Sequence, residues 1–251
     1  MSAPPPHIEL EGVTLAYGDF VIQRDLSFRI RRGDVFIIMG GSGCGKSTVM
    51  RSLTGLLEPK SGRIFYDGTS FWEMPAHERA RTMRRFGVMY QSGALWSSMT
   101  LSENVALPIE QYTTLSREQI RAIAAYKLAL VGLRGFDDFY PSEISGGMQK
   151  RVGVARAMAL DPEVLLFDEP SAGLDPLSAR LMDQLILELR ESLGTTMVVV
   201  THELASIFTI ADDAVFLDPE TKTMLTTGNP RELRDHSDLP KVRAFLTRGA
   251  S

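Results

Sequence analysis

A glycine-rich segment between an apolar run and a helix pattern constrains this chain more than any other feature. The segment reads Gly40-Gly-Ser-Gly-Cys-Gly-Lys-Ser47 and matches the pattern G-x-x-x-x-G-K-S/T. Glycines let the backbone curl so that successive N–H groups point at phosphate oxygens, and a following helix N-terminus adds partial positive charge there. The apolar run at 35–39 is typical of a strand buried on both faces of a parallel sheet. The sequence therefore predicts a phosphate-binding loop at the end of such a strand.

The loop offers ligands for a nucleoside triphosphate and for Mg²⁺. Lys46 is expected to bind the β- and γ-phosphates, and the Ser47 hydroxyl is expected to ligate the metal ion. The residues predicted to contact the nucleotide here are Gly40, Gly41, Ser42, Gly43, Cys44, Gly45, Lys46, Ser47 and Thr48. Because a helix N-terminus and Lys46 lie nearby, we expect the pKa of the Cys44 thiol to be lowered. The alternative is that Cys44 is an inert small residue.

A second apolar run, at 164–167, ends in the two carboxylates Asp168 and Glu169. If this run is a strand of the same parallel sheet, Asp168 lies at the carboxyl edge beside the phosphate loop. Asp168 is then a candidate ligand of Mg²⁺ through its water shell. Glu169 is a candidate general base that polarises the attacking water. A simple strand-terminal turn is the alternative, since Asp-Glu-Pro also suits turns.

The remaining pattern predicts an α/β chain with a mostly parallel sheet. Alternating apolar residues over 8–30 indicate an antiparallel β region before the loop. We expect one phosphate-loop (RecA-like) domain over 1–251, with a nucleotide-binding core formed by 1–91 and 161–251. Residues 92–160 are mostly helical in character and are expected to form an inserted helical subdomain.

A long helix is predicted to begin a few residues after Asp168 and Glu169. Asp175 and Pro176 suit its N-cap and first helical position, and Gly194 suits its end. The apolar stripe expected along this helix consists of Leu177, Leu181, Met182, Leu185, Ile186 and Leu189. Residues 239–246 also carry apolar side chains at helical spacing. The sequence leaves open whether this tail docks on its own subunit, on a second copy or on a regulatory protein.

Composition excludes several classes of protein. With 44 % hydrophobic residues and a formal net charge of −4, the chain is neither disordered nor suited to general nucleic-acid binding. Its single cysteine excludes a disulfide-stapled scaffold. No apolar run approaches the roughly 20 residues that span a bilayer, and no secretory signal is apparent. We expect a soluble, cytosolic protein that can attach to a membrane through a partner.

Further motifs resemble those of ABC-type ATPases. The segment Ile144-Ser-Gly-Gly-Met148 resembles the L-S-G-G-Q signature that separates this family from other phosphate-loop enzymes, although Ile144 and Met148 depart from it. The resemblance covers residues 8–229. Tyr17 corresponds to the family's adenine-stacking aromatic residue, and Gln91 corresponds to its Q-loop glutamine. The segment ending at Asp175 resembles the D-loop, and His202 resembles the switch histidine. Each of these residues, taken alone, has an ordinary structural explanation. The resemblance rests on their order along the chain.

The resemblance implies a head-to-tail dimer with two ATP molecules at its interface. A second helix N-terminus facing the γ-phosphate would close the site and stabilise its charge. In the family this helix comes from the other protomer, so Ser145, Gly146 and Gly147 of one chain would face the ATP held by Lys46 of the other. Asp175 would communicate between the two sites. The implied catalytic residues are Lys46, Gln91, Glu169 and His202, and the implied metal ligands are Ser47, Gln91 and Asp168.

The resemblance also implies a transport role. Non-transport relatives carry long coiled coils or two cassettes, and exporters fuse the cassette to membrane helices, whereas this sequence shows none of these patterns. A detached ATPase that pairs with integral-membrane permease subunits at the cytoplasmic face of a bacterial inner membrane is implied instead. The segments 91–100, 103–108 and 242–246 are similar to ATPases of MCE-type lipid transporters, which implies an MCE-domain lipid-binding partner and a phospholipid substrate. Whether a small regulatory subunit also binds stays open. The alternative functions are the ATPase of a small-solute (amino-acid type) importer and a soluble ATPase switch.

Three large apolar residues follow the Q-loop position, namely Leu95, Trp96 and Met99. They lie in a stretch expected near the surface, and we expect them to line the groove that receives the permease. The alternative is that they pack within the core of the helical insert.

Overall fold

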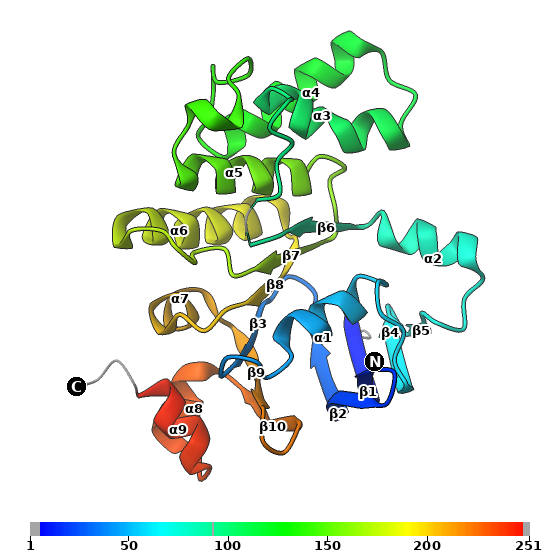
Figure 1. The fold of residues 1–251 in the computed structure, drawn as a ribbon, viewed down its shortest axis with the longest axis vertical. Coiled ribbons are helices and arrows are strands. Elements are labelled where there is room, and N and C mark those ends of the chain that lie inside the picture. The colour runs from blue at the N-terminus through cyan, green and yellow to red at the C-terminus, as the bar shows by residue number, and fades with distance from the viewer. Residues whose placement is uncertain (1–5, 92, 248–251) are drawn as a thin grey trace.

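The computed structural model describes residues 6–91 and 93–247 and has the predicted α/β architecture (Figure 1). Its strands are β1 (Ile8–Tyr17), β2 (Phe20–Ile30), β3 (Val35–Gly40), β4 (Ser61–Tyr66), β5 (Thr69–Ser70), β6 (Phe86–Met89), β7 (Val164–Asp168), β8 (Thr196–Val200), β9 (Asp213–Asp218) and β10 (Thr223–Gly228). Its helices are α1 (Lys46–Leu53), α2 (Ala76–Met83), α3 (Leu101–Tyr112), α4 (Arg117–Leu130), the 3₁₀ helix η1 (Pro141–Glu143), α5 (Gly146–Ala157), α6 (Pro176–Leu193), α7 (Leu204–Ile210), α8 (Pro230–His236) and α9 (Pro240–Leu246).

The central sheet has the strand order β10-β9-β3-β8-β7-β6, and it is parallel except for β10 at its edge. Strand β3 is buried along its whole length because both faces of the sheet are covered. Phe36 and Ile38 point to one face, where they pack with α1 and the antiparallel sheet. Ile37 and Met39 point to the opposite face, where they pack with helices that include α6. The predicted mostly parallel sheet is therefore confirmed.

The antiparallel sheet has the strand order β2-β1-β4-β5. In the sequence, β1 and β2 precede the glycine-rich loop, whereas β4 and β5 follow α1. Helices α3, α4 and α5 gather at the opposite end of the molecule from α8 and α9 (Figure 1). Thr100 and Ser116 open α3 and α4 with capping boxes. Ser92, the first residue of the predicted insert, lies outside the described residues, and the division at 92–160 stays a prediction. Among the described residues, no helix is both long enough and apolar enough to cross a membrane.

Helix α6 begins and ends where the sequence predicts, but its first turns are not covered. Asp175 caps the helix by accepting hydrogen bonds at 3.0 Å from the backbone N–H groups of Leu177 and Ser178. The buried part of the expected stripe is Met182, Leu185, Ile186 and Leu189. Leu177 and Leu181 are 68 % and 50 % exposed, so their assignment to the core-facing stripe is wrong. These two leucines lie on the first two turns of α6, which project beyond the packed core.

The structure answers the open question of where the tail docks. Val242, Phe245 and Leu246 of α9 are buried in the main core of the same chain. The ring of Phe245 meets that of Phe216 on β9 edge to face, with 5.2 Å between the ring centroids. The tail therefore packs on its own subunit.

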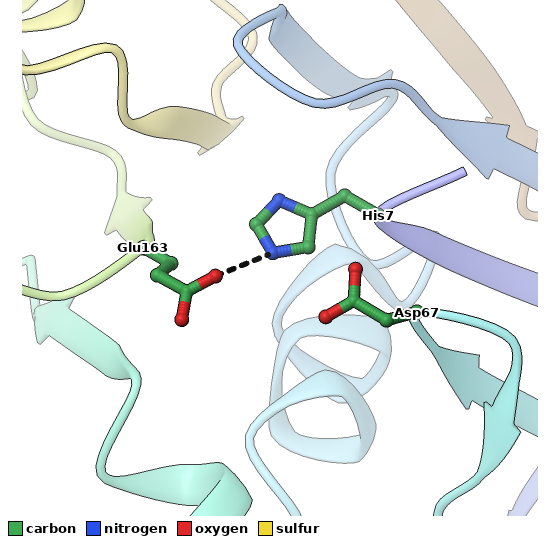
Figure 2. Close-up of side chains that lie close together, drawn as sticks. All are labelled: His7, Asp67 and Glu163. Carbon is green, nitrogen blue, oxygen red and sulfur yellow. Dashed lines mark ion pairs between the residues drawn. The ribbon is translucent and has the colours of Figure 1, made fainter. Parts of the chain in front are cut away.

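A network of charged side chains joins the two sheets at the end remote from the glycine-rich loop. His7, Asp67 and Glu163 point toward one another, with His7 Nε2 3.8 Å from Glu163 Oε2 (Figure 2). Arg85 bonds both carboxylates, to Asp67 Oδ2 at 2.6 Å and Glu163 Oε1 at 2.7 Å, and Arg32 also bonds both. With two guanidinium groups already on these carboxylates, the three residues form an ion-pair network rather than a cation site.

Burial and the nearby Arg32 lower the pKa of His7 to about 4. The ring is held by a 2.7 Å hydrogen bond between Nδ1 and the Thr196 hydroxyl on β8. Because the folded-state pKa lies below the ordinary value of 6.5, the folded state binds this proton more weakly than the unfolded state. Stability from this group is therefore lost as the pH falls from 6.5 to about 4. The guanidinium of Arg85 lowers the pKa of Glu163 from 4.5 to about 2. The stability that this carboxylate contributes is therefore lost only as the pH falls from 4.5 to about 2.

We predict that the free energy of unfolding of the wild type falls by about 2 kcal/mol between pH 7 and pH 5 because His7 binds a proton only in the unfolded state. In His7→Asn, which keeps a polar atom near Thr196, the loss over this interval should be smaller by that amount. Urea denaturation at the two pH values measures the difference. His77→Asn, at an exposed histidine of α2, is the control and should keep the wild-type pH dependence. An unchanged pH dependence in His7→Asn would contradict the assignment.

Candidate active site

Most of the predicted site residues meet at the carboxyl edge of the central sheet. Because β3, β6, β7 and β8 run parallel, the segments that follow them converge at one edge. A pocket of about 530 Å³ opens there. It is lined by Ile22, Gly40, Gly41, Ser42, Gly43, Gly45, Lys46, Ser47, Thr48, Gln91, Glu169 and His202. Five separate stretches of sequence thus contribute to one concave site.

The loop after β3 curls so tightly that two of its positions require glycine. Gly40 has φ 151° and Gly45 has φ 95°, both in a region that side chains disfavour. A Cβ at Gly40 would lie 2.4 Å from the carbonyl oxygen of Leu217, and one at Gly45 would lie 2.7 Å from Ile22 Cγ2. The Lys46 ammonium folds back over the loop and donates to the carbonyl oxygens of Gly40 and Gly41, each at 3.1 Å. The loop is therefore curled, with a cation above it, as the motif predicts.

Cys44 lies beneath the loop rather than in the pocket. Its side chain is 1 % exposed, and burial raises the pKa of the thiol more than Lys46 lowers it. The expected lowering of this pKa is therefore wrong, because desolvation outweighs the nearby positive charge.

Gln23 on β2 braces the loop, and sequence analysis missed it. Its Nε2 atom donates to the carbonyl oxygen of Cys44 at 2.6 Å and to that of Asp218 at 3.3 Å. The available signal was a polar residue within an alternating apolar strand. That signal was obscured because the β1–β2 register shifts between Val13 and Leu15, which changes the face on which Gln23 lies.

Asp168, at the end of β7, lies beside the start of α1. The Ser47 hydroxyl donates to Asp168 Oδ1 at 3.5 Å. Burial and the neighbouring Glu169 carboxylate raise the pKa of Asp168. A hydroxyl and a carboxylate of this kind supply the oxygen ligands that Mg²⁺ prefers, and a cation would offset the cost of burying Asp168. The donor set therefore fits the predicted metal ion.

Glu169 and His202 contact each other in the pocket. His202 Nδ1 lies 2.8 Å from Glu169 Oε1. The other carboxylate oxygen, Oε2, is buried and has no hydrogen-bond partner among the described residues. Glu169 is 9 % exposed and has φ 50°, an uncommon backbone conformation for a residue other than glycine. One oxygen is thus held by the imidazole, while the second is buried and unpaired among the described residues.

Seven predicted site residues do not line the pocket of this single chain, although two of them, Cys44 and Asp168, lie directly beside residues that do. Tyr17, at the end of β1, is exposed, and its hydroxyl accepts a 3.1 Å hydrogen bond from Arg51 Nη1. Ser145 caps α5 by accepting from the backbone N–H of Met148 at 3.2 Å. A Cβ on Gly147 would lie 3.6 Å from Ser178 Cβ, so the start of α5 lies beside the start of α6. The predicted residues outside the pocket lining are Tyr17, Cys44, Ser145, Gly146, Gly147, Asp168 and Asp175.

This α/β fold, with a curled glycine loop leading into α1, defines the class of phosphate-loop proteins. The family model described as "ABC transporter" matches residues 23–172. The chain belongs to the ABC transporter family.

Individual relatives and structures agree with this assignment. Over 239 residues the chain is 42 % identical to the "Probable ribonucleotide transport ATP-binding protein mkl" of Mycobacterium tuberculosis, covering 95 % of this chain but 66 % of that relative. It is 38 % identical over 242 residues to the "Intermembrane phospholipid transport system ATP-binding protein MlaF" of Escherichia coli K12, covering 95 % and 88 % of the two chains. A dimeric bacterial ABC transporter cassette superposes with a TM-score of 0.79 at 30 % identity, covering 88 % of this chain and 98 % of the other.

Proposed function

We propose that the chain is the ATP-hydrolysing subunit of an ABC transporter. The observation that carries this proposal is the convergence of the phosphate loop, Asp168, Glu169 and His202 on one pocket. Each supplies a part that hydrolysis of a phosphate anhydride requires: anion binding, metal ligation, and activation of water. The names of the relatives, which describe ATP-binding proteins of transport systems, support the same reading.

In this proposal the residues act mainly by holding and orienting the substrate. The loop amides and Lys46 bind the β- and γ-phosphates. Ser47, Gln91 and Asp168 hold Mg²⁺, which when bound neutralises charge on the β- and γ-phosphate oxygens. Glu169 would accept a proton from the attacking water, and His202 holds the carboxylate through its Oε1 atom.

We further propose that the active form is a head-to-tail pair of chains. Ser145, Gly146 and Gly147 lie at the N-terminus of the 12-residue helix α5, outside the pocket of their own chain. In a head-to-tail pair this helix N-terminus faces the γ-phosphate bound by the partner. Leu177 and Leu181, exposed beside Asp175, are apolar surface available for burial in such a pair. The dimeric form of a similar cassette supports this arrangement.

We predict that Glu169→Gln binds ATP·Mg²⁺ with an affinity within about threefold of the wild type but loses turnover about 100-fold or more. ATP should then hold the variant as a dimer, because the nucleotide at the interface is not consumed. Phosphate release and sedimentation velocity measure the two effects. Glu191→Gln, at an exposed carboxylate of α6, is the matched control. Wild-type turnover by Glu169→Gln would show that another group activates the water.

For the transported substrate, we propose a phospholipid or a related lipid, moved with an MCE-domain partner. The likeness to a phospholipid-transport ATP-binding protein covers most of both chains and supports this choice. A small-solute transporter is the second candidate, since other relatives of similar identity are named for ribonucleotide transport. The chain spans 66 % of the length of those mycobacterial relatives.

We propose that the chain works at the cytoplasmic face of a bacterial inner membrane, held there by a permease. Trp96 supports this, because its side chain is 60 % exposed while its backbone is fixed. Asn104 of α3 accepts from the Trp96 N–H at 2.8 Å and donates to its carbonyl oxygen at 3.1 Å. Leu95 packs against the main core instead, as the alternative for these residues predicts. A rigid, exposed indole is typical of residues that dominate binding at protein interfaces.

We predict that the tagged chain, isolated from mildly solubilised membranes, recovers a permease together with an MCE-domain protein. Trp96→Ala should reduce that recovery about tenfold or more without changing ATP hydrolysis by the isolated chain. Quantitative mass spectrometry measures the recovery, and Tyr126→Ala, at an exposed aromatic residue of α4, is the control. Recovery of a different permease would favour the small-solute candidate. A chain found without any membrane partner would contradict the transport proposal.

A further inference from the structure

Lys150 is a buried lysine whose ammonium group contacts the backbone of residues 169–172, just after β7. It lies on α5, five positions after Ser145, and is 8 % exposed. Its Nζ atom donates to the carbonyl oxygens of Glu169 at 3.4 Å and Pro170 at 2.9 Å, and also to that of Ala172. Three contacts from one side chain thus attach α5 to a single four-residue segment.

This arrangement satisfies the ammonium group and fixes the segment at the same time. An ammonium has three donors and costs free energy when buried unless those donors are satisfied. Burial lowers the pKa of Lys150, and the Glu169 carboxylate opposes that shift. Because all three acceptors belong to residues 169–172, a movement of α5 cannot leave this segment unchanged while the contacts persist.

Glu169 is held from two sides. On the side of the central sheet, its backbone N–H donates to the carbonyl oxygen of Val200 on β8 at 2.8 Å. On the side of α5, its own carbonyl oxygen accepts from Lys150. Its φ of 50° is a conformation that surrounding contacts must maintain in a residue with a side chain. These contacts set the direction of the carboxylate, which meets His202 at 2.8 Å.

We infer that Lys150 is a positioning residue that couples the orientation of α5 to the carboxylate of Glu169. The inference rests on the proposed function, in which Glu169 activates the attacking water. In the proposed dimer, the N-terminus of α5 faces the partner's nucleotide. A shift of α5 when the dimer closes is then transmitted by Lys150 to the general base of the same chain, so each chain senses the ATP held by its partner.

The test compares Lys150→Met, which removes every donor, with Lys150→Arg and Lys150→Gln, which keep N–H donors. In the intact chain, Lys150→Met should lower kcat about 10- to 100-fold, because a base displaced by about 1 Å loses that much. The dissociation constant for ATP·Mg²⁺ should stay within about twofold, since Lys150 does not line the pocket. At least one donor-keeping variant should recover most of kcat. Backbone amides at 169–174 should exchange hydrogen faster in Lys150→Met than in the wild type.

Lys127→Met is the matched control. Lys127 is equally buried on α4, but it pairs with the exposed carboxylate of Asp161, so its removal leaves no buried charge. It should keep kcat and the exchange at 169–174 within about twofold of the wild type.

Three outcomes would overturn the inference: wild-type kcat in Lys150→Met, parallel losses of kcat and ATP affinity, or equal loss of kcat in all three variants with unchanged exchange at 169–174. If Lys150→Met does not fold, Lys150→Ala, which also removes every donor, is judged against Lys127→Met by the same split between kcat and affinity. A wild-type chain that binds ATP without hydrolysing it would contradict the proposed function instead. Hydrogen exchange would still decide whether Lys150 holds the segment.

Discussion

The tight curl of the backbone between β3 and α1 is the constraint on which the site depends. The backbone at Gly40 lies so close to Leu217 on the neighbouring strand that no side chain fits there. A side chain at Gly45 would likewise collide with Ile22 of the antiparallel sheet. Gln23 then fixes the underside of the curl. The loop is thus held by both sheets, so its amide groups are oriented before any ligand arrives.

Parallel strand pairing brings the other groups to this loop. Asp168 ends β7, Glu169 follows it directly, and His202 follows β8, so the sheet register brings all three residues close to the loop. The segment after β7 is held on one side by β8 and on the other by Lys150 of α5. The central sheet determines the position of the Glu169 carboxylate, and α5 determines its orientation.

The strands, the long helix and the phosphate loop could be predicted because each has a local signature: an uninterrupted apolar run, a capping residue, or a spaced glycine motif. Gln91 and His202 have no such signature and were identified only by resemblance to the motifs of ABC ATPases. What could not be predicted depends on tertiary contacts. Gln23 lies beyond a register shift, and Lys150 bonds backbone carbonyls, which have no sequence signature. The pKa of Cys44 depends on how deeply the loop buries it. Leu177 and Leu181 match the helical period, but whether they are covered depends on how far the core extends.

The most direct test of the central proposal is a structure of the Glu169→Gln variant with ATP and Mg²⁺. We expect the phosphates to lie against the loop amides and Lys46, with the metal ion at Ser47 and Asp168. We also expect Ser145 of the partner subunit to face the γ-phosphate. A nucleotide bound away from the loop, or bound at the loop with no second copy closing the pocket, would contradict the account.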